Sequence, residues 1–165
     1  MAKAGEQAAA KLIDILTSRE ALNSKLAALS EPERLLLPPI SDKQISSQNI
    51  SFELAERSAE ARYPALHIYC EKISNLLREK FRTFSGKAQM AVEVRLSQDR
   101  LDGLETKLQM YVDAVTQLLD QNRGDWGHGM FYAGGYDAVF TPVKHGGKNF
   151  IQIAKITFEV GVSSN

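Results

Sequence analysis

The sequence predicts an α+β fold with a largely antiparallel sheet, and two observations carry this prediction. Strand-like segments come in clusters and do not alternate singly with helices, as they would in a parallel α/β sheet. The chain also ends in a long stretch of alternating side chains, interrupted by Gly134-Gly135 and by a glycine-containing turn, which predicts a β-hairpin over residues 130–162. We therefore expect an N-terminal helix with an extended arm, one main helix packed on the sheet, and this long C-terminal β-hairpin.

The N-terminal part of the chain is expected to form the helix and the arm. Large aliphatic residues recur at spacings of three and four over residues 6–29, which predicts one amphipathic helix that ends near Pro32. The polar residues 41–49 are typical of a linker or a long loop. We therefore divide the chain into an N-terminal helix and extended arm over residues 1–49 and an α+β domain over residues 50–165.

The extended arm, residues 35–40, combines apolar side chains with a diproline. Pro39 forces Pro38 into an extended conformation, so the segment cannot continue a helix. Its aliphatic residues either pack on their own domain or cover a neighbouring subunit, and both interpretations stay open. The candidate interface residues of the arm are Leu35, Leu36 and Leu37.

The clearest strand lies in the middle of the chain. Residues 87–97 alternate between apolar and mainly polar side chains, which predicts one buried face and one solvent-exposed face. Residues 63–70 predict a strand before it, in which Cys70 and His67 are packing residues. Residues 50–60 fit either a strand or a helix.

The clearest helix follows over residues 99–122. Its long apolar stripe begins at Leu101, and either Ser97 or Asp99 is expected to cap its N-terminus. The sequence Asn122-Arg123-Gly124 predicts its C-terminal end. Within the helix, Gly103 is interpreted as a position of close packing on the sheet.

The segment from Gly124 to Tyr136 is the most unusual in composition. It contains the single tryptophan and three other aromatic residues among five glycines. Aromatic side chains at this density are favoured at protein–protein contacts, and they are equally common in sheet cores. The candidate interface residues in this segment are Trp126, Phe131, Tyr132 and Tyr136.

Composition excludes several classes of protein. The 165 residues contain 20 Lys and Arg and 20 Asp and Glu, so the formal net charge is zero, which argues against a polybasic nucleic-acid binder and does not oppose self-association. The single cysteine excludes an internal disulfide and a cysteine zinc cage, and it favours a reducing cytoplasm. Neither a signal-peptide core nor a membrane-spanning stretch is expected, so the membrane is not an expected partner.

The motifs of catalysis and cofactor binding are not found. The glycines of residues 124–129 lack the Lys and the Ser or Thr that hold phosphates. Asp125, His128 and His145 are interpreted as polar loop residues and not as metal ligands. We therefore expect no enzyme activity, no cofactor and no metal.

One basic cluster has two interpretations. It contains Phe81 and Phe84 between its cations, so it is suited to contact a nucleic-acid backbone, or it is a solvated edge region whose charge deters unwanted strand pairing. Both interpretations stay open. The cations of the cluster are Arg78, Lys80, Arg82 and Lys87.

The order of these elements, with the stretches Gln121–Trp126, Tyr132–Tyr136 and Lys144–Phe150, resembles tail terminator (tail completion) proteins of tailed bacteriophages. The resemblance covers roughly residues 60–162 and is mainly architectural. It implies a homo-oligomeric ring, usually of six subunits, that caps the tail tube and joins it to the head connector. It implies a virion protein of the tail or neck, assembled in the host cytoplasm, whose partners are its own copies, the tail tube protein and the neck proteins, with no catalysis.

Three alternatives remain open. The first is another head–tail neck or adaptor protein, the second is a small DNA-binding accessory protein that uses the basic cluster, and the third is an uncharacterised small enzyme. In a ring, the same cluster would form a positive collar in the lumen, in transient contact with passing DNA. Charge is also uneven along the neutral chain, because residues 51–97 are net basic and residues 98–124 net acidic, which favours contact between identical subunits.

Overall fold

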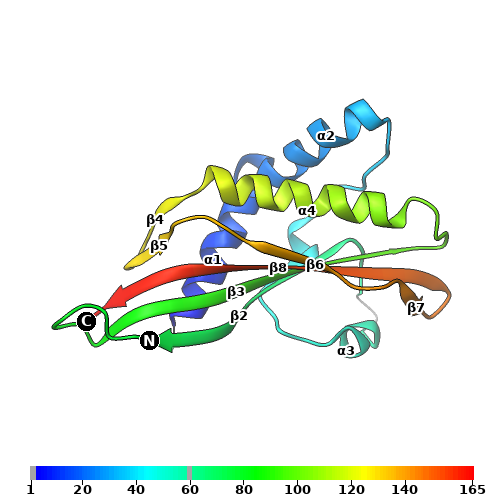
Figure 1. Cartoon of the computed structure of the whole chain (residues 1–165). Helices are drawn as coiled ribbons and strands as arrows, with labels where there is room; N and C mark the ends of the chain where they lie inside the picture. Colours follow the sequence, from blue (N-terminus) through cyan, green and yellow to red (C-terminus); the bar gives the residue numbers. More distant parts are fainter. Residues whose placement is uncertain (1–2, 59–60) are drawn as a thin grey trace.

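A computed structural model describes residues 3–58 and 61–165 and confirms the α+β class with a mostly antiparallel sheet (Figure 1). The strand order is β1-β2-β3-β8-β5-β4, and β6 and β7 also pair with β8. The helices are α1 (Ala4–Thr17), α2 (Ala21–Glu33), α3 (Phe52–Glu56) and α4 (Leu104–Gln121). The strands are β1 (Ile45–Ser46), β2 (Ala65–Asn75), β3 (Phe84–Gln98), β4 (Gly124–Gly127), β5 (Met130–Tyr132), β6 (Asp137–Phe140), β7 (Lys144–Gly146) and β8 (Asn149–Ser164).

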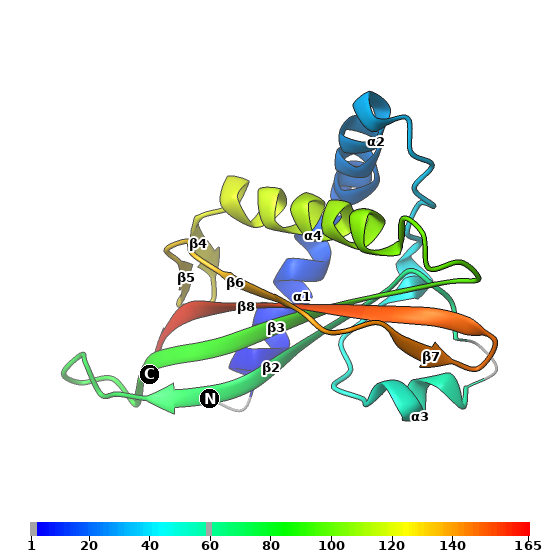
Figure 2. The same ribbon diagram turned by 45° about the vertical axis from the view of Figure 1, so that its right-hand side comes forward.

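The two faces of the sheet are covered unequally. The buried side chains of α1, α2 and α4 form one hydrophobic core with one face of β2, β3 and β8. The short helix α3 lies against the opposite face near one end of the sheet (Figure 2). Most of that second face therefore has no helix over it.

The single helix predicted over residues 6–29 is wrong, because the chain breaks between α1 and α2. Arg19 and Glu20 adopt positive φ angles of 53° and 55°, which end the first helix and redirect the second. The break allows α1 to pack on β2 while α2 packs on α4. Both apolar stripes are then buried at once, Leu12 with the first and Leu22 with the second.

The extended arm packs on its own chain. The side chain of Asn23 donates to the carbonyl oxygen of Ile40 (2.9 Å) and accepts from its amide (2.8 Å). Tyr111 donates from Oη to the carbonyl oxygen of Pro38 at 2.6 Å. The polar stretch after the arm is not only a linker, because it forms β1, which pairs parallel with β2 at Leu66 and His67.

The predicted strand over 87–97 is confirmed within β3, but its second face is not wholly exposed. Arg95 is only 2% exposed and Ala91 is fully buried. Near one end of the sheet, the segment around Ile50 accepts a hydrogen bond from Arg95, and Phe52 of α3 packs with Ile151 and Ile153 of β8 in a second, smaller core. Alternation along one strand cannot reveal a cover contributed by a distant segment.

The long C-terminal hairpin is confirmed, with a first arm divided among β5, β6 and β7, all antiparallel to β8. Gly134-Gly135 lies where the first arm leaves β8. Phe131 pairs with Gly161 and Asp137 pairs with Thr157. Between these two pairs, the first arm of the hairpin advances by six residues while β8 advances by four. The interruption therefore holds two extra residues, one more than a simple β-bulge.

The main helix begins later than predicted. Neither Ser97 nor Asp99 caps α4, since the N-cap position is Gly103 with φ at +75° and no side-chain cap. A Cβ on Gly103 would contact nothing within 4 Å, so this glycine serves the left-handed backbone and not close packing. Leu101, expected in the buried stripe, is exposed. The helix ends as predicted, with Asn122 donating from Nδ2 to the carbonyl oxygen of Leu118 (2.7 Å).

Candidate functional site

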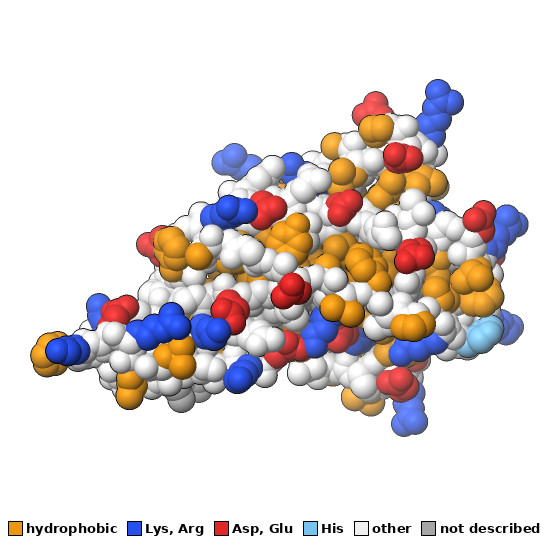
Figure 3. Space-filling view, in the orientation of Figure 1, with side chains coloured by type: hydrophobic (Ala, Val, Ile, Leu, Met, Phe, Trp, Pro, Cys, Tyr) orange, Lys and Arg blue, Asp and Glu red, His pale blue; other side chains and the backbone are white. Residues whose placement is uncertain are grey.

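The first candidate feature is the turn that joins β2 to β3, residues 76–83, which we call the tip. Figure 1 shows it projecting beyond the end of the sheet, and the space-filling view has hydrophobic and basic side chains there, at the left-hand end (Figure 3). Phe81 is 100% exposed and Leu77 is 65% exposed. Large apolar side chains that are exposed close together are a feature of interaction sites.

The backbone of the tip is both strained and braced. Leu77 and Phe81 have φ angles of +47° and +67°, a region that costs bulky residues roughly 1–2 kcal/mol each. The side-chain oxygen of Asn75 accepts from the amides of Leu77 (3.2 Å) and Ser85 (3.1 Å), and Ser85 Oγ accepts from the amide of Glu79 (3.1 Å). These bonds brace the backbone of the turn that carries the two apolar side chains.

The structure divides the predicted basic cluster. Arg78, Lys80 and Arg82 are exposed on the tip, and Arg82 forms an ion pair with Glu79 at 3.4 Å. Lys87 lies inside β3 and pairs with Glu159 of β8 at 2.5 Å. Within this cluster, the cations that remain available for a partner are therefore those on the tip.

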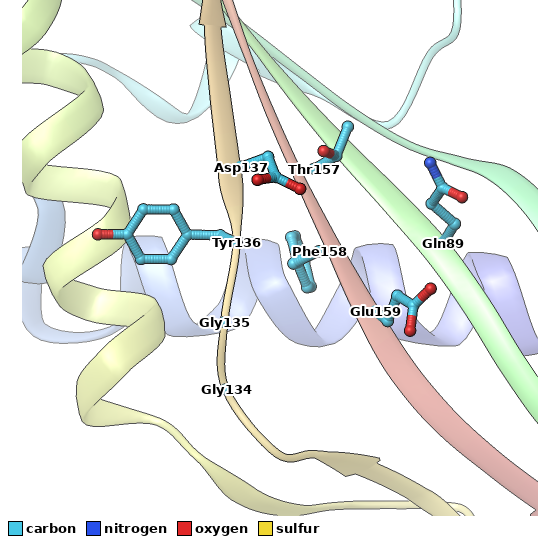
Figure 4. Close-up of a pocket in the computed structure, with 8 residues that line it drawn as sticks. All are labelled: Gln89, Gly134, Gly135, Tyr136, Asp137, Thr157, Phe158 and Glu159. Carbon is cyan, nitrogen blue, oxygen red and sulfur yellow. The ribbon is translucent and has the colours of Figure 1, made fainter.

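The second candidate feature is a groove where the first arm of the hairpin leaves β8. It has a volume of about 410 Å³, and Figure 4 shows the residues that line it. Among the described residues, β8 has no strand partner on this side between its pairs at Thr157 and Gly161. The groove is lined by Gln89, Gly134, Gly135, Tyr136, Asp137, Thr157, Phe158 and Glu159.

The glycine pair keeps the groove open. Gly134 and Gly135 have φ angles of +103° and +91°, which side chains rarely adopt. A Cβ on Gly134 would lie 2.7 Å from Nε of Arg123, and Tyr132 donates from Oη to the carbonyl oxygen of Gly135 at 3.2 Å. The loop is therefore bonded to a buried tyrosine, and the side chain of Arg123 lies too close to Gly134 to leave room for a Cβ.

The groove combines carboxylates with an apolar rim. The carboxylate of Asp137 is exposed and forms no ion pair within the described part of the chain, whereas Glu159 is paired with Lys87. Phe131 on β5 and Val139 on β6 flank the break and are 55% and 62% exposed. The ring of Tyr136 points toward α4, away from Glu159 (Figure 4). This chemistry suits a partner with a cation beside an apolar side chain.

A buried polar network lies near the other end of the same sheet face. Glu93 accepts from Oη of Tyr69 (2.8 Å) and from Nη2 of Arg95 (2.6 Å), and the same nitrogen donates to the carbonyl oxygen of Ile50 (2.6 Å). Burial alone would raise the pKa of Glu93, but the bonds from Arg95 and Tyr69 and the charge of Arg95 lower it overall. Burial and the bond to Glu93 raise the pKa of Tyr69. The network joins the segment before α3 to the sheet.

Two predicted interface residues lie in the core of their own chain. Trp126 and Tyr132 are buried with Phe158, with ring centroids 5.3 Å apart for Trp126–Tyr132 and 5.4 Å for Tyr132–Phe158. Nε1 of Trp126 donates to the carbonyl oxygen of Asn122 at 2.8 Å. Neither ring is accessible to a partner, so neither belongs to an interaction surface.

The other predicted interface residues are at least partly accessible. Phe131 and Tyr136 lie at the groove, while Leu36 is exposed on the arm and Leu35 and Leu37 are half-buried. Sequence reasoning missed Asp137, Val139 and Glu159 as parts of the groove. The available signal was the glycine pair, which marked the break but not the strand exposed beside it.

The residues with metal-binding or nucleophilic chemistry lie apart. No group of three or more His, Cys, Asp or Glu side chains that could hold a metal occurs in the described ranges. Cys70 is half-buried and burial raises its pKa, as expected for an inert thiol. His67 is buried with Nδ1 3.0 Å from Oγ of Ser46, and burial lowers its pKa.

Of the helices in the described ranges, none combines the length and the apolar character that a membrane crossing requires.

The chain was also compared with known proteins. Neither protein-family models, nor curated proteins, nor solved structures gave a match.

Proposed function

We propose that this chain is a structural subunit of a phage tail, a terminator that forms a homo-oligomeric ring on the end of the tail tube and joins it to the head connector. The observation that carries the proposal is the one-sided sheet. Helices cover one face, whereas the opposite face away from α3 is a bare surface of polar and charged side chains from β2, β3 and β8. Copies set side by side would present this face to a common lumen and their helices to the outside.

The bare face supports a lining role because its charges are compensated. Lys87 pairs with Glu159, and Lys155 pairs with Glu71 across the strands. Such a face is polar but has little net charge, so a duplex moving past it would not be held by many phosphate contacts.

Open sheet edges support lateral association. Within the described residues, β1 pairs only with Leu66 and His67, so the rest of β2 has no strand on its outer side. The break beside β8 leaves a second opening near the other edge. Unpaired edges are common sites at which chains join.

Electron microscopy of the purified protein at high concentration tests the proposal. We expect a closed ring of about six subunits with a central opening, the size that the family resemblance implies, bound to one end of isolated phage tail tubes. Particles that stay monomeric at every concentration and never bind a tail tube would contradict it. Rings that bind isolated heads and not tubes would favour the neck-adaptor alternative, and DNA binding that weakens steeply with salt would favour the accessory DNA-binding alternative.

A further inference from the structure

We propose that the tip of one copy docks into the groove beside Gly134-Gly135 of a second copy, so that the subunits join head to tail. This inference deepens the proposed function, because it rests on self-association and names the two surfaces that meet. The occupant of the groove is the β2–β3 turn of a neighbouring subunit.

The apolar parts of the two surfaces match. The tip presents Phe81 and Leu77 on a braced turn, and the groove is flanked by Phe131 and Val139. All four side chains are more than half exposed in the single chain. Burying aromatic and aliphatic side chains away from water is favourable, so their contact provides a driving force for association.

The charges match as well. Arg78 and Lys80 are exposed on the tip, with no ion pair among the described side chains, and Asp137 is the unpaired carboxylate of the groove. Glu159 already has Lys87 as its partner, so Asp137 is the carboxylate open to an incoming cation. Complementary charges around an apolar contact fix its register and oppose wrong partners.

The tip cannot fill the groove of its own chain. Phe84 pairs with Ser164 at the base of the tip, whereas Gln89 pairs with Glu159 at the groove, five residues further along the strands. At roughly 3.4 Å per residue, this is about 17 Å. The tip also projects away from the sheet (Figure 1). The contact therefore joins two copies.

The contact is heterologous, because the tip and the groove are different patches of the same molecule. Each copy then uses its tip on one neighbour and its groove on the other. Repetition of such a contact gives a ring if the rotation closes and a filament if it does not. The bare edge of β8 at the groove can also accept backbone hydrogen bonds from the entering turn.

The test uses two double variants that change exposed side chains. The tip variant is Lys80→Glu with Phe81→Gly, where glycine suits the φ of +67°. The groove variant is Asp137→Asn with Phe131→Ser, which removes the carboxylate without giving the Glu at position 80 of the tip variant a cation to pair with. Matched controls change the same kinds of exposed residue elsewhere, Arg57→Glu with Leu54→Ser at α3 for the tip and Asp102→Asn with Leu101→Ser for the groove. Thermal unfolding and circular dichroism confirm that each variant is folded.

Sedimentation velocity over a concentration series measures the association. We expect the dissociation constant between copies to rise about tenfold or more in the tip variant and in the groove variant, and to stay unchanged in the controls. An equal mixture of the tip and groove variants should form dimers and nothing larger. The groove variant keeps an intact tip and the tip variant keeps an intact groove, and one contact between them uses both. A mixture that stays monomeric overturns the proposal, and so does a tip variant that assembles like the wild type.

The outcomes separate this inference from the proposed function. Rings that persist in both variants would retain the proposed function and overturn the docking contact. Dimers in the mixture, with wild-type protein that forms only open filaments, would retain the docking contact and overturn the ring. DNA binding that is lost in the tip variant while assembly is unchanged would assign the tip cations to nucleic acid and overturn the docking contact.

Discussion

Arg95 shows how a residue on a predicted solvent-exposed face becomes part of the interior. It alternates correctly with the apolar residues of β3, yet the segment around Ile50 covers it and accepts its hydrogen bond. A buried guanidinium is tolerated only with a partner, and Glu93 provides the carboxylate. The pair therefore links the cover to the sheet. It matters for stability because the charge of Arg95 would be buried without a counter-charge if Glu93 were removed.

Substitution of Glu93 by Gln is expected to destabilise the fold by about 3 kcal/mol at neutral pH, because it leaves Arg95 buried without a counter-charge. The folded-state pKa of Glu93 lies below its ordinary value of 4.5, so the stability that its ionised form contributes is present above that value. This stability is lost as the pH falls through the folded pKa. The difference between variant and wild type should therefore shrink in acid.

Urea unfolding at neutral pH and below pH 4 measures both effects. The matched control is Glu159→Gln, which removes an ion pair of 2.5 Å between half-exposed side chains. We expect less than about 1 kcal/mol for the control. Equal losses for the two substitutions would contradict the assigned role of the buried pair.

At the scale of elements, the break between α1 and α2 determines where the arm runs. Because α2 turns onto α4, Asn23 on α2 faces Ile40 at the end of the arm and bonds both backbone groups of that residue. Tyr111 on α4 bonds the diproline from the other side. Three hydrogen bonds from two side chains thus hold an apolar arm that has no regular secondary structure of its own.

Substitution of Asn23 by Ala is expected to destabilise the protein by about 2 kcal/mol and to speed proteolytic cleavage of the arm. It removes two hydrogen bonds and leaves partly buried backbone groups of Ile40 without these partners. Chemical denaturation with limited proteolysis measures both changes. Asn49→Ala, at an exposed asparagine, is the control and should behave as the wild type does. An unchanged cleavage rate in the Asn23 variant would show that the arm is held by packing alone.

At the scale of the whole molecule, the main core crosses the division that the sequence suggested at residue 49. Leu12 and Leu16 of α1 and Leu22 of α2 are buried in the same cluster as Leu108 of α4 and Ile156 of β8. The helix-covered face of β2 and β3 would be solvent-exposed without α1. The N-terminal piece therefore contributes a layer of the fold.

A fragment that contains residues 50–165 is expected to lack a cooperative unfolding transition and to bind a hydrophobic dye. The loss of α1 and α2 uncovers core side chains on β2, β3 and α4. Differential scanning calorimetry and dye fluorescence of the fragment and of the full chain provide the measurement. A sharp calorimetric transition in the fragment would show that residues 50–165 form a domain on their own.

The sequence by itself determined the class of fold, the strand at 87–97, the C-terminal end of the main helix and the hairpin broken at Gly134-Gly135. These features depend on local periodicity and on glycine and turn chemistry, which act over a few residues. The sequence also showed Phe81 and Phe84 among the cations, but not that Phe81 is exposed and Phe84 buried. The position of Phe81 on a projecting tip required the pairing of β2 with β3.

Tertiary structure alone decided the burial of Arg95, Trp126 and Tyr132, the redirection at Arg19 and the groove around Asp137. Each depends on which distant segment covers a given face, and neighbouring residues do not encode that. The groove exists because two extra residues leave a strand edge unpaired, a fact that appears only when the register of β5 and β6 on β8 is known. Periodicity assigns a side chain to a face, and long-range packing determines what lies against that face.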